Sequence, residues 1–136
     1  MENKLRLDIV TPYGSVFSDD VDEFAAPGTE GEFGVFPGHA PFVTTLKVGI
    51  ITYKKGSEVG YIFTSGGYAG IRQDRGVILA DSAERSEGID AERARAAMKR
   101  AEERLKQAEK IDFARAQAAL ERATIRVQLA EKHSAR

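Results

Sequence analysis

The sequence "IDAERARAAMKRAEERLKQAEK", from Ile89 to Lys110, is followed at once by "IDFARAQAALERATIRVQLAEK", from Ile111 to Lys132. The two stretches agree at 12 of 22 positions when one is laid on the other. In each stretch, mostly apolar residues recur at alternating spacings of three and four, which is typical of an amphipathic helix with a heptad seam. The seam residues are Ala91, Ala94, Met98, Ala101, Leu105 and Ala108, then Phe113, Ala116, Leu120, Ala123, Val127 and Ala130. The repeat therefore predicts two similar helices.

Two aspartates indicate where these helices begin. Asp90 and Asp112 each precede a strong helix-forming run, which is where an N-cap residue is favoured. We therefore expect the break between the helices around Lys110 and Ile111. Because so short a connection brings the helices back on each other, the pattern predicts an antiparallel hairpin.

The predicted seam consists mostly of alanine, and this limits how strongly the helices adhere. Burial stabilises by about 0.8 kcal/mol per CH₂ group, so an alanine contributes much less than a leucine. Alanine also has the highest helix propensity, so each arm can stay helical after the arms separate. Two interpretations remain open at this point, a hairpin that opens and a hairpin that is permanently docked.

Arginines are the other feature that the two helices share. They recur at the same heptad positions: Arg93, Arg100 and Arg104 in the first helix, and Arg115, Arg122 and Arg126 in the second. We expect the two rows to flank one side of the seam, with few acidic partners three or four residues away. Such a cluster suits a phosphate-bearing ligand or an acidic protein surface. The alternative is a solvated face without a partner, the usual state of surface arginines.

Composition divides the chain near Gly88. All 13 glycines and all 4 prolines lie in residues 1–88, whereas 13 alanines lie in residues 89–136. The first part carries 8 basic and 13 acidic residues and the second 12 basic and 8 acidic, so the net charge of -1 combines -5 and +4. This balance lacks the strongly basic face of a nucleic-acid-binding protein. We therefore predict two domains, 1–88 and 89–136, and no nucleic-acid partner.

The first domain reads as short strands separated by turns. Leu5, Leu7 and Ile9 alternate with more polar residues, the pattern of a half-buried strand. Further strands are expected near Val16 to Ala26, Glu32 to Phe36, Phe42 to Lys54, Val59 to Ser65, Tyr68 to Gln73, and Val77 to Ala83. Because no helical stretch intervenes, the strands indicate a β-sandwich or barrel rather than βαβ units. The fold class is therefore α+β, an N-terminal antiparallel β-sandwich or barrel followed by a C-terminal antiparallel α-helical hairpin.

Independent catalysis is not expected. The chain has no cysteine and only two histidines, His39 and His133, and no glycine-rich phosphate loop precedes a helix. The acidic run Asp19, Asp20, Asp22 and Glu23 lacks the spacing of metal ligands and fits a solvated strand and turn. The amino terminus does not look like a signal peptide, and no apolar run reaches the roughly 20 residues of a membrane helix. We expect no catalytic residue, no metal and no required cofactor.

Four segments together carry a family resemblance. They are "GEFGVFPGHAPFV" (31–43), "SGGYAGIR" (65–72), "VILADSAER" (77–85) and "IDAERA" (89–94). In this order and spacing the chain resembles the epsilon-subunit family of the bacterial rotary ATP synthase, over essentially its whole length. The resemblance implies a sandwich that binds the foot of the gamma subunit and rests on the membrane c-ring. It also implies that the loop around Glu32 and His39 contacts the rotor.

The resemblance further implies a regulatory role for the hairpin. When extended, the hairpin would meet the beta and alpha subunits and inhibit ATP hydrolysis. The protein would be peripheral to the cytoplasmic face of the bacterial plasma membrane and serve a proton- or ion-translocating complex. A rival interpretation, a stand-alone nucleotide or anion sensor, stays open, and co-purification of gamma would distinguish the two.

ATP is the ligand that the resemblance implies for the folded hairpin. The family's nucleotide motif I-D-x-x-R-A stands here as Ile89, Asp90, Arg93 and Ala94. By resemblance, Glu84 and Asp90 face the adenine and ribose. The arginines around the phosphates would be Arg93, Arg100, Arg115, Arg122 and Arg126. ATP would act as a regulatory ligand of the hairpin.

Overall fold

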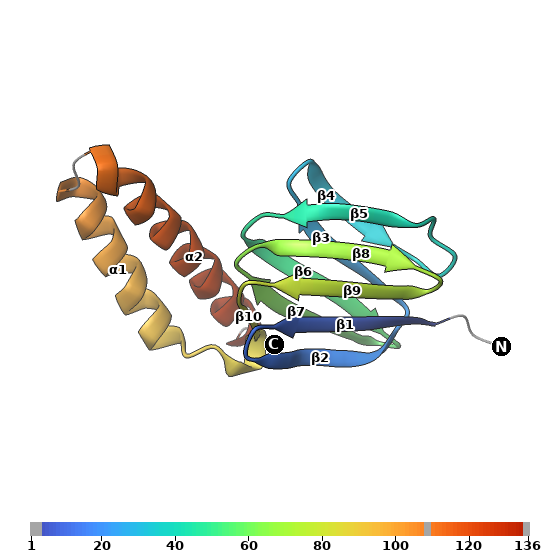
Figure 1. Ribbon diagram of the computed structural model, residues 1–136. Helices are drawn as coiled ribbons and strands as arrows, with labels where there is room; N and C mark the ends of the chain where they lie inside the picture. The colour runs from blue at the N-terminus through green and yellow to red at the C-terminus, as the bar shows by residue number, and fades with distance from the viewer. Residues whose placement is uncertain (1–3, 108–109, 135–136) are drawn as a thin grey trace. The chain divides into compact units, whose positions relative to one another are not determined.

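The computed structural model describes residues 4–107 and 110–134. The chain divides into two compact units, Met1–Arg85 and Ser86–Arg136. The first contains strands and the second contains helices (Figure 1). This is the α+β architecture that the sequence predicts.

The described residues of the first unit form ten strands. Their bounds are β1 Leu5–Thr11, β2 Gly14–Val21, β3 Glu23–Gly28, β4 Gly31–Val35, β5 Phe42–Leu46, β6 Gly49–Lys55, β7 Glu58–Thr64, β8 Gly67–Arg72, β9 Arg75–Ala80 and β10 Ala83–Arg85. Hydrogen-bonded neighbours run in the order β10-β7-β6-β3-β5-β8-β9-β1-β2. Strand β4 lies outside this order and pairs with β3. All pairs are antiparallel except β1 with β9, which is parallel.

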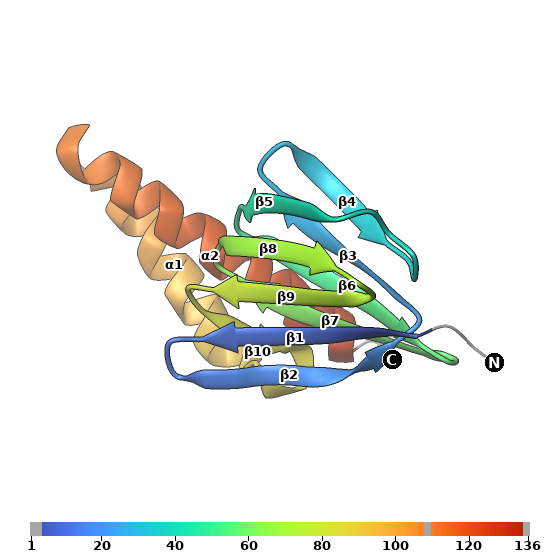
Figure 2. The ribbon, with the colours of Figure 1, turned by 45° about the vertical axis from the view of Figure 1, so that its right-hand side comes forward.

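These strands form the two layers of a sandwich. One layer holds β5, β8, β9, β1 and β2, and the other holds β3, β4, β6, β7 and β10 (Figures 1 and 2). The path crosses between them at β3 and β5, which share the single register pair Gly28 with Leu46. Apolar side chains from both layers form one buried core, including Leu5, Leu7, Ile9, Val21, Phe24, Ile51, Ile62 and Ile78. The alternation read in residues 5–10 is thus confirmed.

Three predicted strands are wrong in the same way, because each one is two strands. Residues 16–26 break at Asp22, residues 42–54 break between β5 and β6, and residues 77–83 break between β9 and β10. At each break the chain leaves one layer for the other. The breaks are held by long-range hydrogen bonds, such as Asp22 N–H to the Lys54 carbonyl at 2.8 Å and Lys47 N–H to the Pro27 carbonyl at 3.0 Å. At the first break the alternation of buried residues changes phase, from Val21 to Phe24, and both halves still contribute to the same core.

The second unit is a helical hairpin. A short 3-10 helix, η1 (Ser86–Gly88), precedes α1 (Ala91–Gln107), and α2 spans Lys110–Ser134. The helices pack on each other, and an ion pair of 3.6 Å between Arg95 Nη2 and Glu131 Oε1 joins the start of α1 to the end of α2. The hairpin is therefore antiparallel, as predicted.

Most of the predicted seam is buried. Ala94, Ala101, Ala116, Ala123, Val127 and Ala130 are each less than a tenth exposed. Ala91, Met98, Leu105 and Leu120 are half-buried. Phe113 is 46% exposed, because it lies in the first turn of α2 beside the connection, where little of α1 remains to cover it. Asp112 is not an N-cap, since α2 begins two residues earlier, and the seam residue Ala108 lies outside the described residues.

Candidate functional site

The beginning of α1 is built by the motif residues Ile89, Asp90, Arg93 and Ala94. The Ile89 N–H donates to the Ser86 carbonyl at 3.3 Å, which leads the chain out of η1. Asp90 Oδ1 accepts the Arg93 N–H at 3.1 Å, and the Asp90 carbonyl accepts the Ala94 N–H at 2.9 Å. Asp90 is therefore the N-cap of α1, as the sequence predicts. Ala94 packs in the seam and Arg93 is exposed, so the motif also serves as a helix start.

Four of the six repeated arginines, Arg93, Arg100, Arg115 and Arg122, directly precede a buried alanine. Arg93, Arg100, Arg104 and Arg115 are exposed, and Arg122 and Arg126 are half-buried. Among the described residues, no carboxylate forms an ion pair with Arg93, Arg100, Arg104, Arg115 or Arg122. Their guanidinium groups are thus free to donate hydrogen bonds to an anion.

The Arg95–Glu131 ion pair shows how these arginines are distributed along the hairpin. Arg93 is two residues from Arg95 and Arg126 is five residues from Glu131, so both lie in the half of the hairpin that contains the ion pair, whereas Arg100 is near the middle of α1. Arg115 is sixteen residues from Glu131, about 24 Å along the axis at 1.5 Å per residue. It lies in the other half. Arg122 is near the middle of α2.

Glu84 belongs to the sandwich unit. It lies on β10, half-buried, in register with Phe63 of β7. The sequence prediction joined it to the hairpin residues, and the structure describes it as part of the other compact unit.

The residues predicted to contact the rotor lie at and after β4. Glu32 is exposed on β4 in register with Pro27. His39 closes a turn that begins at Phe36, because the His39 N–H donates to the Phe36 carbonyl at 3.2 Å. The His39 ring bonds the Ala40 carbonyl through Nδ1 at 2.6 Å, and its centroid is 6.0 Å from that of Phe42. The imidazole is thus held between backbone and an aromatic ring.

Sequence reasoning missed an exposed apolar surface on the sandwich. Val43 is 78% exposed, Tyr68 60% and Leu79 55%. Tyr68 pairs directly with Leu79, and Val43 pairs with Gly70, two residues from Tyr68 on the same face of β8. The three side chains therefore form one strip across β5, β8 and β9, called the apolar strip below. The sequence signal for each is a large apolar residue at a strand position that faces solvent, where a polar residue is usual. Only the strand register shows that the three residues are neighbours.

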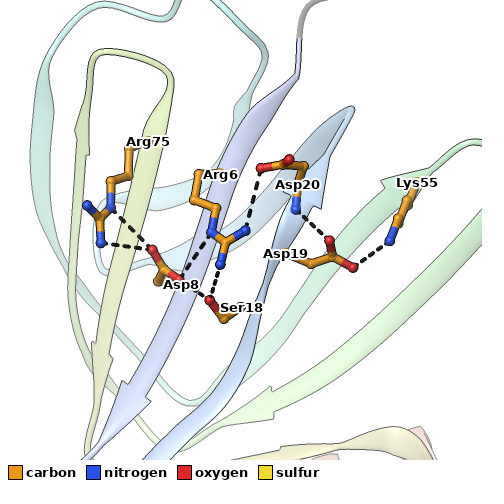
Figure 3. A network of polar contacts seen from close by, with 7 residues as sticks. All are labelled: Arg6, Asp8, Ser18, Asp19, Asp20, Lys55 and Arg75. Carbon is orange, nitrogen blue, oxygen red and sulfur yellow. Dashed lines mark hydrogen bonds and ion pairs between the residues drawn. The ribbon is translucent and has the colours of Figure 1, made fainter.

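A polar network borders the apolar strip on the same face (Figure 3). Asp8, in register with Val77, accepts a hydrogen bond from Ser18 Oγ at 2.5 Å and from Arg75 Nε at 3.2 Å, and Arg6 Nε lies 3.6 Å away. The Ser18 hydrogen bond, aided by the charges of Arg75 and Arg6, holds the pKa of Asp8 below its ordinary value against the opposing effect of burial. The charged groups beside the apolar strip therefore form ion pairs with one another.

The acidic run in residues 19–23 is paired as well. Asp19 contacts Lys55, Asp20 contacts Arg6, Asp22 contacts Lys4, and Glu23 contacts Lys54. Within residues 4–107 and 110–134, no group of three or more metal-ligating side chains could hold a metal ion. In the same residues no helix is both long enough and apolar enough to cross a membrane.

Comparisons with known proteins cover nearly the whole chain. Residues 4–86 match the beta-sandwich domain of the ATP synthase delta/epsilon chain, and residues 87–131 match its long alpha-helix domain. The ATP synthase epsilon chain of Thermodesulfovibrio yellowstonii is 55% identical over 108 residues, 79% of this chain and 77% of the relative. That of Geobacter metallireducens is 49% identical over 106 residues, 78% and 77% of the two chains.

Solved structures share the fold at low identity. A chain in the Euglena gracilis mitochondrial ATP synthase structure (OSCP/F1/c-ring) superposes with a TM-score of 0.80 at 21% identity, over 98% of this chain and 82% of that one. A chain in the central stalk/c-ring structure of the Tetrahymena thermophila mitochondrial ATP synthase gives 0.57 at 18% identity, over 98% of both chains.

Proposed function

The chain belongs to the delta/epsilon-chain family of the ATP synthase, and we propose that it is a non-catalytic central-stalk subunit that couples the rotor and regulates ATP hydrolysis. Its partners are the gamma subunit and the c-ring of a bacterial proton- or ion-translocating complex. The protein lies at the cytoplasmic face of the plasma membrane as a peripheral subunit. Relatives named epsilon chains, at about half identity, support this role.

The apolar strip is the observation that carries the docking proposal. Val43, Tyr68 and Leu79 present adjoining apolar surface to solvent. Adjoining large apolar side chains on a soluble protein mark interaction sites, and a central aromatic is the commonest anchor. We assign the strip to gamma. The paired charges around Asp8 at its border then orient the partner without leaving a charge unpaired.

The c-ring contact is assigned to Glu32 and the turn that ends at His39. Glu32 lies on β4, and the turn that ends at His39 lies between β4 and β5.

The hairpin is the proposed regulator. Its buried seam consists mainly of alanine, so the helices separate with little loss of apolar burial. In the folded state ATP binds at the start of α1 through Ile89, Asp90, Arg93 and Ala94. The other proposed ligands are Glu84, Arg100, Arg115, Arg122 and Arg126. When ATP is scarce, the hairpin extends toward the beta and alpha subunits, and its arginines meet acidic side chains there.

Asp90 can both cap α1 and bind ligand. A carboxylate has about four lone-pair sites on its two oxygens, and the cap uses one of them. Arg115 lies in the other half of the hairpin from Arg93 and Arg126, so we expect Arg115→Ala to weaken ATP binding less than Arg126→Ala.

Capture of purified gamma by the immobilised full-length chain tests the docking proposal. Tyr68→Ser combined with Leu79→Ser should weaken capture by about 2 kcal/mol or more, roughly thirtyfold, because it truncates the centre of the strip. Tyr13→Ser is the matched control, since Tyr13 is 95% exposed outside the strip. Equal capture by the folded strip variant and the control would remove gamma from this surface. Failure of the wild-type chain to capture gamma would favour the stand-alone sensor.

A further inference from the structure

The turn between β8 and β9 contains two residues in an unusual backbone conformation. Arg72 pairs with Arg75, and the two residues between them, Gln73 and Asp74, have φ of 50° and 58°. Positive φ at both central positions defines a type I′ turn, for which Asn-Gly is the preferred pair because glycine has no Cβ to clash. This chain has Asp where glycine would be favoured. The requirements of the turn alone do not account for that choice.

The Asp74 side chain has a long-range partner. Its Oδ1 accepts a hydrogen bond from the Gly38 N–H at 2.6 Å, although the residues are 36 apart in sequence. The Asp74 carbonyl accepts the Arg6 N–H at 2.9 Å. One residue thereby joins the β8–β9 turn, the first residues of β1 and the segment after β4.

Gly38 belongs to the turn that positions His39. Phe36 to His39 form a type II turn: Pro37 is at the second position, Gly38 has φ of 86° at the third, and the His39 N–H closes the turn on the Phe36 carbonyl. In this type of turn the N–H of the third residue is not used within the turn. Asp74 accepts that N–H, so its carboxylate holds the segment just before His39.

We infer that Asp74 is a positioning residue for the rotor contact. It holds the Phe36–His39 turn against the β8–β9 turn, and this gives His39 a defined place beside Phe42. The inference rests on the proposed function, in which His39 and Glu32 meet the c-ring. A turn that is already ordered loses less conformational entropy when it binds. The hydrogen bond from the Gly38 N–H to the carboxylate therefore accounts for an aspartate at a position whose positive φ favours glycine.

Three substitutions separate the hydrogen bond between Asp74 and Gly38, called the tether below, from the shape of the β8–β9 turn. Asp74→Gly removes the carboxylate and suits the positive φ, so the turn itself should be at least as stable. Asp74→Asn keeps a side-chain oxygen that can accept the Gly38 N–H, and asparagine tolerates this conformation. Asp74→Ala loses the acceptor and also strains the turn, because alanine tolerates a positive φ less well than aspartate. If Asp74 served only the shape of the β8–β9 turn, the glycine and asparagine variants would behave alike. If its bond to Gly38 matters, only the asparagine variant should keep the wild-type properties.

The first measurement is hydrogen exchange of the Gly38 amide by NMR in the full-length chain. Asp74→Gly should accelerate this exchange about tenfold, the ratio expected for loss of one hydrogen bond to a charged acceptor at an exposed site. Asp74→Asn should restore most of the protection. Unchanged Gly38 exchange in Asp74→Gly would overturn the inference.

The second measurement uses the complete synthase in inverted membrane vesicles, with ATP-driven proton pumping divided by ATP hydrolysis. Asp74→Gly should lose part of this coupling while gamma capture stays at the wild-type level, and Asp74→Asn should keep it. Normal coupling despite faster Gly38 exchange would also overturn the positioning role. A Glu32→Ala, His39→Ala double variant then separates the two ideas: if it uncouples, the rotor contact stands without the tether, and if it does not, the rotor contact is itself wrong.

Discussion

Replacement of Asp90 separates the two roles assigned to its carboxylate, helix capping and ATP binding. Asp90→Asn keeps an oxygen that can accept the Arg93 N–H, and asparagine is about as good an N-cap as aspartate. Asp90→Ala removes both the cap and the charge. The pair of variants therefore distinguishes a weaker helix from a weaker ligand contact.

The structure sets the expected magnitudes. Loss of an N-cap destabilises a helix by about 1 kcal/mol. A hydrogen bond between ligand and carboxylate contributes about 1.5 to 3 kcal/mol. Asp90 is exposed, so the lower value applies, and it corresponds to roughly a tenfold rise in the dissociation constant for ATP. Asp90→Asn keeps an accepting oxygen and loses only the charge, so we expect about 1 kcal/mol, roughly a fivefold rise, with little change in helix stability. Asp90→Ala should show at least this rise and also a less stable helix.

The assay is calorimetric titration of each full-length variant with ATP, ADP and phosphate, together with thermal unfolding followed by circular dichroism without ligand. If Asp90→Asn bound ATP as tightly as the wild type, the carboxylate charge would have no part in the site. If Asp90→Ala unfolded at the same temperature as Asp90→Asn, the cap would contribute nothing measurable. ATP binding too weak to detect in the wild type would remove the nucleotide site altogether.

Three further predictions follow from other parts of the chain. Gly60→Ala should destabilise the sandwich by about 1 to 3 kcal/mol in urea unfolding, because an added Cβ would meet a buried tyrosine ring at 2.0 Å. Gly70→Ala is the control and should be neutral, because a Cβ there would meet no atom within 4 Å. Equal effects of the two substitutions would contradict the packing argument. The lowered pKa of Asp8 contributes stability above its unfolded pKa of about 4, and this contribution is lost as pH falls through the folded pKa. The difference in unfolding free energy between wild type and Asp8→Asn should therefore shrink on acidification. A constant difference would contradict this expectation. A cysteine pair introduced across the seam, at positions whose Cα atoms lie within about 7 Å, should lock the hairpin when oxidised, in a chain without other cysteines. The complete synthase should then hydrolyse ATP freely, and reductant should restore inhibition at low ATP; equal rates would refute the switch.

Much of the hairpin could be predicted because its signals are local. The spacing of Ala94, Ala101, Ala116 and Ala123 predicted a buried seam, and all four are buried. The identity of Asp90 predicted a cap, and its carboxylate accepts the expected N–H. The family was also recognisable from motifs that are continuous in sequence, and the two domain matches confirm it.

The predicted ligand and rotor contacts stay predictions. The start of α1 is a local feature, and the structure describes its four motif residues together. Arg115 was grouped with them by resemblance, yet it lies in the other half of the hairpin. Glu84 belongs to the sandwich unit. Sequence position alone does not give the distance between residues on the two helices.

The sequence by itself determined which segments are helical, which face of each helix is buried and that a strand-rich domain comes first, because periodicity, capping and turn propensity act within a few residues. Tertiary structure alone decided where the chain crosses between layers, as at Asp22, whose N–H bonds the Lys54 carbonyl. It also brought Tyr68 beside Leu79, and Asp74 to Gly38. These contacts join residues far apart in the chain, and their free energy depends on strand register, which no short stretch of sequence specifies.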